Sequence, residues 1–437
     1  MLRLLKNIFA LLLFFFLAAC QKEDDVAEVP EINIPEVVEP PTPTPTPQGQ
    51  SVPLITSTPI PCENGFAGRY PCAGYDLINR VDLAQMGAEA TNDNWGWTDT
   101  TTGKEYVLQG LDNGVAFLDI SSPTQIKFLG KLPTATEPSV WRDIKVYNDH
   151  AYIVSEASGH GLQVFDLRRL VDLTAFRTFS ADHVETSFGS AHNIAINEST
   201  GFAYVVGARK NNVAMDSGGP MFYDLSDPGR PTLVGGYQGS SYAHDAQIVT
   251  YNGPDTAHVG KEIYFGSHSD GGANNQIVIV DVSDKSNPVL ITRVTYSNGG
   301  YTHQGWLDED HRYFYLGDEL DEYNYGHRTK TLVFDLADLE NPVEHHNYYG
   351  PTNAIDHNGY VVGDALFLAN YTAGFREIDI SQIDNGQMQE VRYFDTFPAN
   401  DSAGFDGVWN VYPFFESGLI AISETSDGLY LVRRSNE

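Results

Sequence analysis

The 437-residue sequence contains few cysteines, few basic residues and no long apolar run beyond its first twenty residues. Its 26 Lys and Arg residues are outnumbered by 58 Asp and Glu residues, and the formal net charge is −32. An excess of negative charge on this scale argues against nucleic acid or an anionic membrane surface as a partner. The sequence also lacks a Walker loop and a dinucleotide-binding fingerprint between a strand and a helix. It therefore gives no indication of a nucleotide-dependent activity.

The first twenty residues have the pattern of a processing signal rather than of a folded element. A short basic region precedes an apolar stretch at residues 11–17, which is too short to span a membrane comfortably. Ala18 and Ala19 come directly before Cys20, and this arrangement resembles a bacterial lipoprotein signal. The resemblance implies cleavage of residues 1–19 and lipid attachment to Cys20. An ordinary secretory signal with an incidental cysteine is the alternative.

Residues 20–60 are predicted to form an extended spacer. They are acidic and rich in proline, and they include an alternating Pro-Thr run at residues 41–47. A segment without apolar periodicity cannot bury a core of its own. The acidic residues after Cys20 resemble the surface-export tag of Bacteroidota lipoproteins. We therefore expect a protein that is held at the bacterial outer membrane by the lipid on Cys20 and faces the cell exterior.

Two cysteines remain if Cys20 carries the lipid. Cys62 and Cys72 are then expected to form a disulfide in an oxidising compartment, near the start of the folded domain at residues 61–437. A redox-active pair is the alternative, but these cysteines lack the close Cys-x-x-Cys spacing of such pairs.

A repeated strand-and-turn unit organises residues 61–437. Its clearest copy is Gln276–Asp281, a β-branched strand that ends in an aspartate and precedes a turn closed by Asn287 and Pro288. Similar strands recur at a period of about 40–60 residues, which is typical of blades arranged around an axis. Six copies end in an aspartate that is expected to cap the following turn. These are Asp119, Asp166, Asp224, Asp281, Asp335 and Asp379.

Alignment of the units on their second strands gives seven blades. The seventh unit ends after its third strand, whereas residues 77–83 form a spare strand before the first blade. A ring should not leave sheet edges open, so this N-terminal strand is predicted to complete the last blade. The predicted fold is an all-β, seven-bladed β-propeller closed by its N-terminal strand.

Several motifs between residue 62 and the end resemble the choice-of-anchor B family, whose members carry LVIVD-type propeller repeats. They include Trp95-Gly96-Trp97, Ala191-His192-Asn193-Ile194, His244-Asp245-Ala246-Gln247 and Tyr301-Thr302-His303-Gln304-Gly305-Trp306. The resemblance implies a propeller that reaches the cell surface through a lipid or another anchor. It implies no reaction, because the family has no assigned one.

Four units place a histidine at the start of the innermost strand. The innermost strands line the channel of a propeller, so equivalent positions are expected to form a ring at one mouth. These histidines are His192, His244, His303 and His357. Neighbouring positions of the same ring are predicted to bind a ligand, and they hold Asp143, Asn193, Asp245, Gln304, Asn358 and Trp409.

A second ring is expected beside the histidines, because the second strand of each blade returns to the same mouth. Glu156 and Glu319 lie at the ends of two such strands. Imidazole and carboxylate groups together suit a divalent transition metal, namely Zn, Mn or Fe, better than Ca. A metal held there could lower the pKa of a bound water, with Glu156 or Glu319 as the base.

The histidines are open to three interpretations. They could hydrogen-bond the neighbouring blade as purely structural groups, hold a metal, or form a polar mouth without a metal. Our leading hypothesis is a non-enzymatic binding or scaffold module, whose partner is an extracellular protein or a glycan at the channel mouth or across the blade loops. The alternative is a metal-dependent hydrolase or lyase that acts on an extracellular polymer, with the four histidines as ligands. Propellers host both classes, so the sequence does not decide whether the protein is an enzyme.

Overall fold

The computed structural model describes residues 50–435, except residues 240 and 270–273. The predicted signal, the lipid site at Cys20 and the spacer up to residue 49 therefore lie outside the described residues. Within the described part of the chain, no helix is long and apolar enough to cross a membrane.

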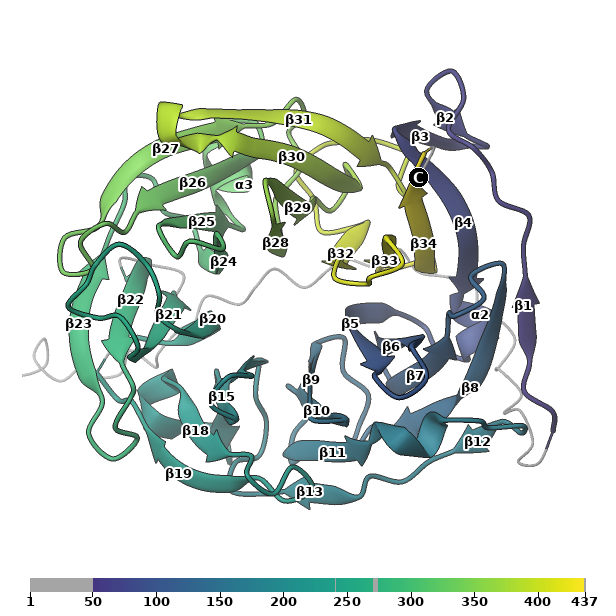
Figure 1. Ribbon diagram of the computed structural model, residues 1–437, viewed down its shortest axis with the longest axis horizontal. Helices are drawn as coiled ribbons and strands as arrows, with labels where there is room; N and C mark the ends of the chain where they lie inside the picture. The colour runs from purple at the N-terminus through teal and green to yellow at the C-terminus, as the bar shows by residue number, and fades with distance from the viewer. Residues whose placement is uncertain (1–49, 240, 270–273, 436–437) are drawn as a thin grey trace, which may run out of the picture.

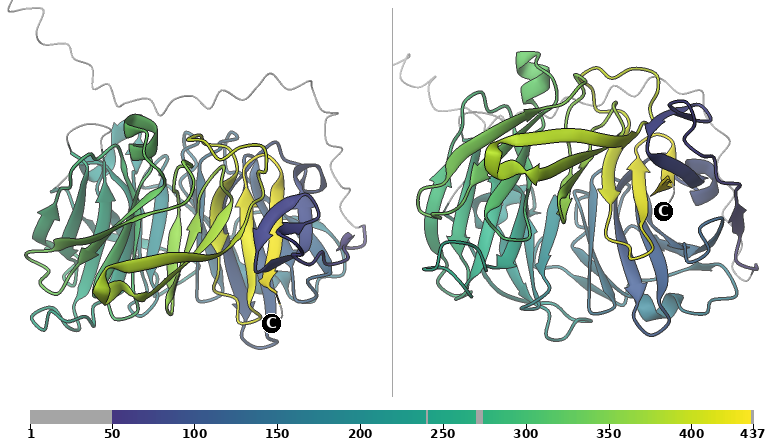
Figure 2. Two further views of the ribbon diagram at one scale, coloured as in Figure 1. Left: turned by 90° about the horizontal axis from the view of Figure 1, so that it is seen from above. Right: turned by 45° about the horizontal axis from the view of Figure 1, so that its top comes forward.

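Seven sheets surround a central axis, and each has four main antiparallel strands ordered from the axis to the rim (Figure 1). In side view the strands cross the thickness of the disc (Figure 2). The predicted all-β, seven-bladed propeller is thereby confirmed.

The strands are named here by their place in the blade. The innermost are β5 (Thr91–Asp99), β9 (Arg142–Tyr147), β14 (Asn193–Asn197), β20 (Ala243–Thr250), β24 (Thr302–Leu307), β28 (Gly359–Val362) and β32 (Val408–Tyr412). The second are β6 (Lys104–Leu111), β10 (His150–Ser155), β15 (Phe202–Val206), β21 (Glu262–His268), β25 (Tyr313–Asp318), β29 (Ala365–Ala369) and β33 (Leu419–Glu424). The third are β7 (Gly114–Asp119), β11 (Leu162–Asp166), β18 (Met221–Asp224), β22 (Gln276–Asp281), β26 (Lys330–Asp335), β30 (Phe375–Gln382) and β34 (Gly428–Arg434). The outermost are β8 (Gln125–Pro133), β13 (His183–Glu185), β19 (Thr232–Gly236), β23 (Val289–Val294), β27 (Val343–Tyr349), β31 (Gln387–Phe394) and β4 (Tyr75–Asp82).

Shorter strands and helical turns lie outside the four main strands of each blade. Extra strands are β1 (Leu54–Thr56), β2 (Phe66–Ala67), β3 (Tyr70–Ala73), β12 (Arg177–Thr178), β16 (Arg209–Lys210) and β17 (Val213–Ala214). The helical turns are α2 (Leu83–Met86), η1 (Leu167–Leu170), η2 (Met215–Gly218), α3 (Asp321–Tyr325) and η3 (Ile383–Asn385).

The N-terminal strand closes the last blade as predicted. β4 pairs antiparallel with β34, and the two strands lie side by side in Figure 1. This pairing removes the open edge that the seventh unit would otherwise present. The predicted disulfide is also present, because Cys62 and Cys72 are joined just before β4 begins. The pairing of β4 with β34 therefore closes the ring, and the disulfide constrains the segment just before β4.

The described residues pack against the propeller before the predicted boundary at residue 61. β1 pairs antiparallel with the outer strand β8 of the first blade, and Ile55 at its centre is buried. Residues 50–60 thus pack against the propeller, although they were assigned to the spacer. A three-residue strand with a single buried side chain has too little apolar periodicity to be recognised in a sequence.

The strand-end aspartates cap turns as predicted. In all six copies a carboxylate oxygen accepts a hydrogen bond from the backbone N–H two residues further on. The repeated aspartate therefore fixes the same exit turn at the end of the third strand in six of the seven blades.

The apolar core lies between neighbouring blades. Alternate residues of β10 point to opposite neighbours: Ala151 and Ile153 pack towards the first blade, and Tyr152 and Val154 towards the third. Each blade is thus buried on both faces, and the innermost strands are held rigidly around the channel.

Candidate functional site

β-bulges at the channel mouth determine how several of the predicted site residues point. The register between inner and second strand shifts at His244, at His303 and at Trp409, where the inner strand has one extra residue. Such a bulge re-aims a side chain and is common beside functional sites. As a result, His244 lines the channel at one mouth, and Asp245, the next residue, lines it closer to the other mouth.

The four predicted histidines do converge. Ring centroids are 4.1 Å apart for His192 and His244, 4.2 Å for His244 and His303, and 4.3 Å for His303 and His357. They line a hollow of about 20 Å³, which has room for one ion or water. Trp409 lies against His357, with ring centroids 4.8 Å apart. We call this hollow the histidine mouth.

His192 forms an ion pair with Glu156 across two blades. Its Nδ1 lies 2.5 Å from Oε1 of Glu156. Burial alone would lower the pKa of His192, but the hydrogen bond and charge of Glu156 outweigh it and raise that pKa. The same pair lowers the pKa of Glu156 against the effect of burial. The carboxylate of Glu156 is therefore already paired with His192.

His244 and His357 bond the neighbouring blade through Nδ1. The Nδ1–H of His244 donates to the carbonyl of His303 at 3.0 Å, and that of His357 donates to the carbonyl of Trp409. This supports the structural interpretation of these histidines, yet it also leaves Nε2 of each with a lone pair. Burial lowers the pKa of His357 to about 3 and that of His244 well below its usual value, so both rings are neutral. Neutral imidazole with Nδ1–H on a backbone carbonyl is the usual state of a metal ligand.

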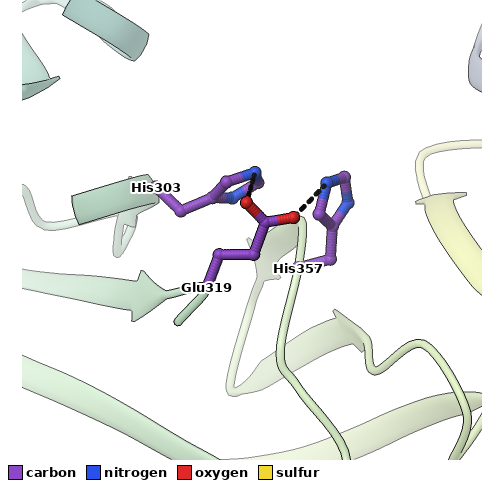
Figure 3. Close-up of side chains that lie close together, drawn as sticks. All are labelled: His303, Glu319 and His357. Atoms are coloured by element: carbon purple, nitrogen blue, oxygen red, sulfur yellow. Dashed lines mark ion pairs between the residues drawn. The ribbon is translucent and has the colours of Figure 1, made fainter. Parts of the chain in front are cut away.

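Glu319 lies between His303 and His357 (Figure 3). Its Oε2 is 3.7 Å from Nε2 of His303, and its Oε1 is 3.8 Å from Nε2 of His357. Tyr371 donates a hydrogen bond of 2.8 Å to Oε1. Burial raises the pKa of Glu319 to about 7 and lowers that of His303. All three groups are buried, and their ligand atoms lie within 4.8 Å of one another.

The donor set of this group suits a transition metal. Tetrahedral ligands at about 2.1 Å from an ion are separated by about 3.4 Å, so atoms that lie within 4.8 Å of one another would have to approach by up to about 1.4 Å to bind one ion. Among the described residues Nδ1 of His303 has no hydrogen-bond partner. The predicted set of four imidazoles is thus reduced to His303 and His357 with Glu319, because His192 is paired with Glu156 and His244 lies outside the group whose ligand atoms come together.

The predicted ligand-binding residues divide between two hollows. Asn193 and Trp409 line the histidine mouth, Asp245 and Gln304 line a second cavity at the far end of the channel, and Asn358 lines both. Asp143 is buried and pairs with Lys145. The prediction of one ring at one mouth is wrong for Asp245 and Gln304. Each follows a bulged histidine, and a strand residue lies about 3.3 Å further along the channel than its predecessor.

Sequence reasoning missed the walls of that second cavity. Its volume is about 290 Å³, and it has an aromatic lining at the ends of the inner strands. The aromatic residues are Trp95, Trp306, Tyr360, Tyr412 and Phe414. The sequence did contain a signal for four of these five residues. Trp95, Trp306, Tyr360 and Tyr412 each lie two positions after a polar residue in or directly before an inner strand, namely Asp93, Gln304, Asn358 and Asn410.

Two other groups within the described part of the chain could hold an ion by proximity alone. Asp321, Glu322 and His327 form one beside α3, and Asp255, His258 and Glu340 form the other near the rim.

Comparison with known proteins supports the repeat and the fold. The model of the LVIVD repeat matches residues 272–296, which cover β22 and β23. The chain contains an LVIVD repeat. No curated protein matches this LVIVD propeller significantly.

Many solved structures resemble it, and the following two are examples. The crystal structure of the RRP9 WD40 repeats has a TM-score of 0.52 at 8% identity, and the alignment covers 82% of this chain and 97% of that one. A protein from Lactobacillus plantarum has a TM-score of 0.49 at 13% identity, with 76% and 88% covered. At such low identity the first likeness supports the propeller fold alone, and the second is too weak to support an argument.

Proposed function

We propose that this protein is a lipid-anchored, cell-surface binding module of the choice-of-anchor B type, with one divalent transition-metal ion in its histidine mouth. The anchor and the location rest on the lipoprotein-like signal that ends at Cys20 and on the acidic residues after it. The partner is an extracellular protein or a glycan. The net charge of −32 argues against nucleic acid.

One observation carries the metal site, namely the position of Glu319 between two neutral buried imidazoles. A buried polar group without a partner costs about 1–3 kcal/mol, and this site holds an unpaired Nδ1 on His303. An ion bound to Nε2 of His303 would not itself pair this Nδ1, so the proposed ion site rests on Glu319 and on the Nε2 atoms of the two rings. Two nitrogens and one carboxylate oxygen favour Zn, Mn or Fe over Ca.

The size of the histidine mouth favours binding over catalysis. About 20 Å³ accommodates an ion or a water but not a segment of a polymer. The ion would then tie the fifth and sixth blades together through His303, Glu319 and His357, which belong to those blades. A partner would bind elsewhere on the propeller.

A metal-dependent hydrolase or lyase remains the second candidate because of the state of Glu319. In this candidate the histidines alone hold the metal and Glu319 is the general base, because a carboxyl group with a pKa of about 7 is in the range of an efficient base. Glu156, the other predicted base, is already paired with His192. This candidate requires that metal-loaded protein release soluble fragments from an extracellular polysaccharide and that Glu319→Gln stop the release. If the loaded wild-type protein releases no fragments, the enzyme hypothesis fails.

The metal content of the purified protein tests the main proposal. Elemental mass spectrometry should find about one Zn, Mn or Fe per chain, and the His303→Ala, His357→Ala double variant should lose it. His346→Ala, on the outer strand β27, is a matched control that should retain the ion. A metal-free wild-type protein that also takes up none of these ions would contradict the proposal.

The anchor is tested separately. Replacement of Cys20 by Ala should move the protein from the membrane fraction to the soluble fraction of the producing cell. A Cys20→Ala variant that stays in the membrane fraction would contradict a lipid anchor at this residue.

A further inference from the structure

The second cavity, at the opposite end of the channel from the histidine mouth, has the features of a ligand site. We call it the aromatic mouth. Trp95, Trp306, Tyr360, Tyr412 and Phe414 form its wall. Neighbouring rings meet edge to face, with centroids 5.0 Å apart for Trp306 and Tyr360 and 5.2 Å apart for Trp95 and Tyr412. Its volume of about 290 Å³ is at the lower end of the range for small-molecule pockets.

Polar side chains form the floor of the aromatic mouth. Oε1 of Gln247 accepts a hydrogen bond from the backbone N–H of Leu307, and Oε1 of Gln304 accepts one from Gly359. Both side chains line the cavity, so the NH₂ group of each amide is a donor available to a ligand. The carboxylate of Asp245, which lines the same floor, supplies an acceptor.

The charges around the cavity disfavour an ionic ligand. Lys145 forms an ion pair of 2.5 Å with Asp143, and its ammonium group already lies over the Trp95 ring, 4.5 Å from the centroid. A cationic ligand would find that aromatic face already occupied by the lysine. An anionic ligand would meet Asp245 and Glu198 in the lining. The cavity is thus suited to a neutral ligand.

A purely apolar ligand is also disfavoured, because it would leave the amides and the carboxylate of the floor without partners. We propose that the aromatic mouth binds one ring of a neutral sugar. Sugar hydroxyl groups both donate and accept, so they can pair with Asp245 and with the amides of Gln247 and Gln304. The apolar face of the ring would pack on Trp306 or Trp95. The ring belongs either to a free monosaccharide or to the end of a longer glycan, since both present the same chemistry.

This proposal concerns a different site from the metal site and does not depend on it. Isothermal titration calorimetry and tryptophan fluorescence of the purified protein should be recorded with D-glucose, D-galactose, D-mannose and N-acetylglucosamine. Maltotriose, cellotriose and chitotriose should be tested beside them. At least one of these sugars should bind saturably, with a Kd of about 1 mM or lower. A trisaccharide that binds more tightly than its monomer identifies the end of a glycan as the ligand, and equal affinity identifies the single ring.

Two substitutions assign the binding to the aromatic mouth. Trp306→Leu and the nearly isosteric Asp245→Asn should each weaken the binding of that sugar by about tenfold or more. Trp409→Leu, at the histidine mouth, is the matched control and should leave the affinity unchanged. Thermal unfolding of all three variants identifies any that fail to fold, and Asp245→Asn is the least disruptive of them.

Further measurements separate this proposal from the metal site. Sugar binding should survive removal of metal by EDTA, because none of the three proposed metal ligands lines the aromatic mouth. Absence of binding by every sugar at about 50 mM would overturn the proposal. It would also be overturned if Trp306→Leu and Trp409→Leu weakened binding equally, or if choline bound while no neutral sugar did.

Discussion

The two mouths of the channel are built from the same seven inner strands, yet they differ in nearly every physical property. One end carries imidazoles around a hollow of about 20 Å³, and the other carries aromatic rings around a cavity of about 290 Å³. Both sets repeat from blade to blade. The comparison teaches that one repeat can present two unrelated surfaces, because the first and last residues of a strand lie on opposite faces of the disc.

The two ends also differ in how well their polar groups are satisfied. At the aromatic mouth Tyr360 donates to Asn410, and the amide oxygens of Gln247 and Gln304 accept from the next blade, which leaves their NH₂ groups for a ligand. At the histidine mouth, by contrast, Nδ1 of His303 is unpaired among the described residues and Glu319 is held at a raised pKa. Sites that break the usual rules of polar satisfaction are often functional. On this basis the aromatic mouth should contribute more to stability, and the histidine mouth should depend on a bound ion.

The largest expected effect is at the aromatic mouth. Tyr360→Ala should lower the free energy of unfolding by about 3–5 kcal/mol, because a buried aromatic ring and its hydrogen bond to Asn410 are lost. Denaturant unfolding checks this value. Trp409→Ala removes a ring that is only partly buried at the histidine mouth, so it should cost distinctly less. Equal costs would remove the proposed difference in stability between the two ends.

The second prediction concerns the pH dependence of stability. It depends on a buried carboxyl group on the face that carries the histidines. Burial raises the pKa of Glu424, at the end of β33, from 4.5 to about 8, and the charge of Asp427 adds to the shift. The folded protein keeps this proton where the unfolded chain releases it, so stability should fall as the pH rises from about 4.5 to 8. Relative to Glu424→Gln, the wild-type protein should lose about 3–4 kcal/mol between pH 5 and pH 8. Parallel stability curves would show that Glu424 is not held in its neutral form.

The third prediction distinguishes the roles of Glu319 and Glu156, the two carboxylates of the histidine mouth. The preferred metal at a concentration of about 100 times its Kd should stabilise the wild-type protein by about 2.7 kcal/mol. Glu319→Gln should abolish this gain, whereas Glu156→Gln should keep it, because Glu156 is paired with His192 outside the proposed ligand set. Thermal unfolding with and without metal measures both. If Glu156→Gln loses the gain as well, the proposed ligand set is wrong.

The smallest effect is on the metal-free protein. His303→Leu removes a buried ring with an unpaired nitrogen and replaces it with an apolar side chain of similar size. The free energy of unfolding should therefore change by less than about 1 kcal/mol, in either direction. Equilibrium denaturation in EDTA tests this. A loss of more than about 2 kcal/mol would make His303 a structural residue.

The sequence predicted much of the architecture because the repeats are regular. The alternating strands, the aspartates after the third strands and the missing fourth strand of the last unit together define seven blades and their closure by β4. The convergence of His192, His244, His303 and His357 followed from their shared register in the blade. Such regularities survive because each blade must form the same sheet.

The details of the site could not be predicted in this way. A bulge of one residue at His244 or His303 leaves no mark in the sequence, yet it separates the histidine from the polar residue that follows. The choice of Nδ1 for the blade-to-blade bond of His357 depends on where the carbonyl of Trp409 lies. The pairing of Glu156 with His192 likewise depends on the spacing between two blades.

The most direct test of the account is to locate an ion in crystals of the protein. Diffraction data from crystals grown with Zn²⁺ or Mn²⁺ should be collected on both sides of the absorption edge of the metal. The account predicts an anomalous peak about 2.0–2.2 Å from Nε2 of His303, Nε2 of His357 and a carboxylate oxygen of Glu319. A histidine mouth without such a peak, while the ion binds at Asp321 and Glu322 or nowhere, would contradict it.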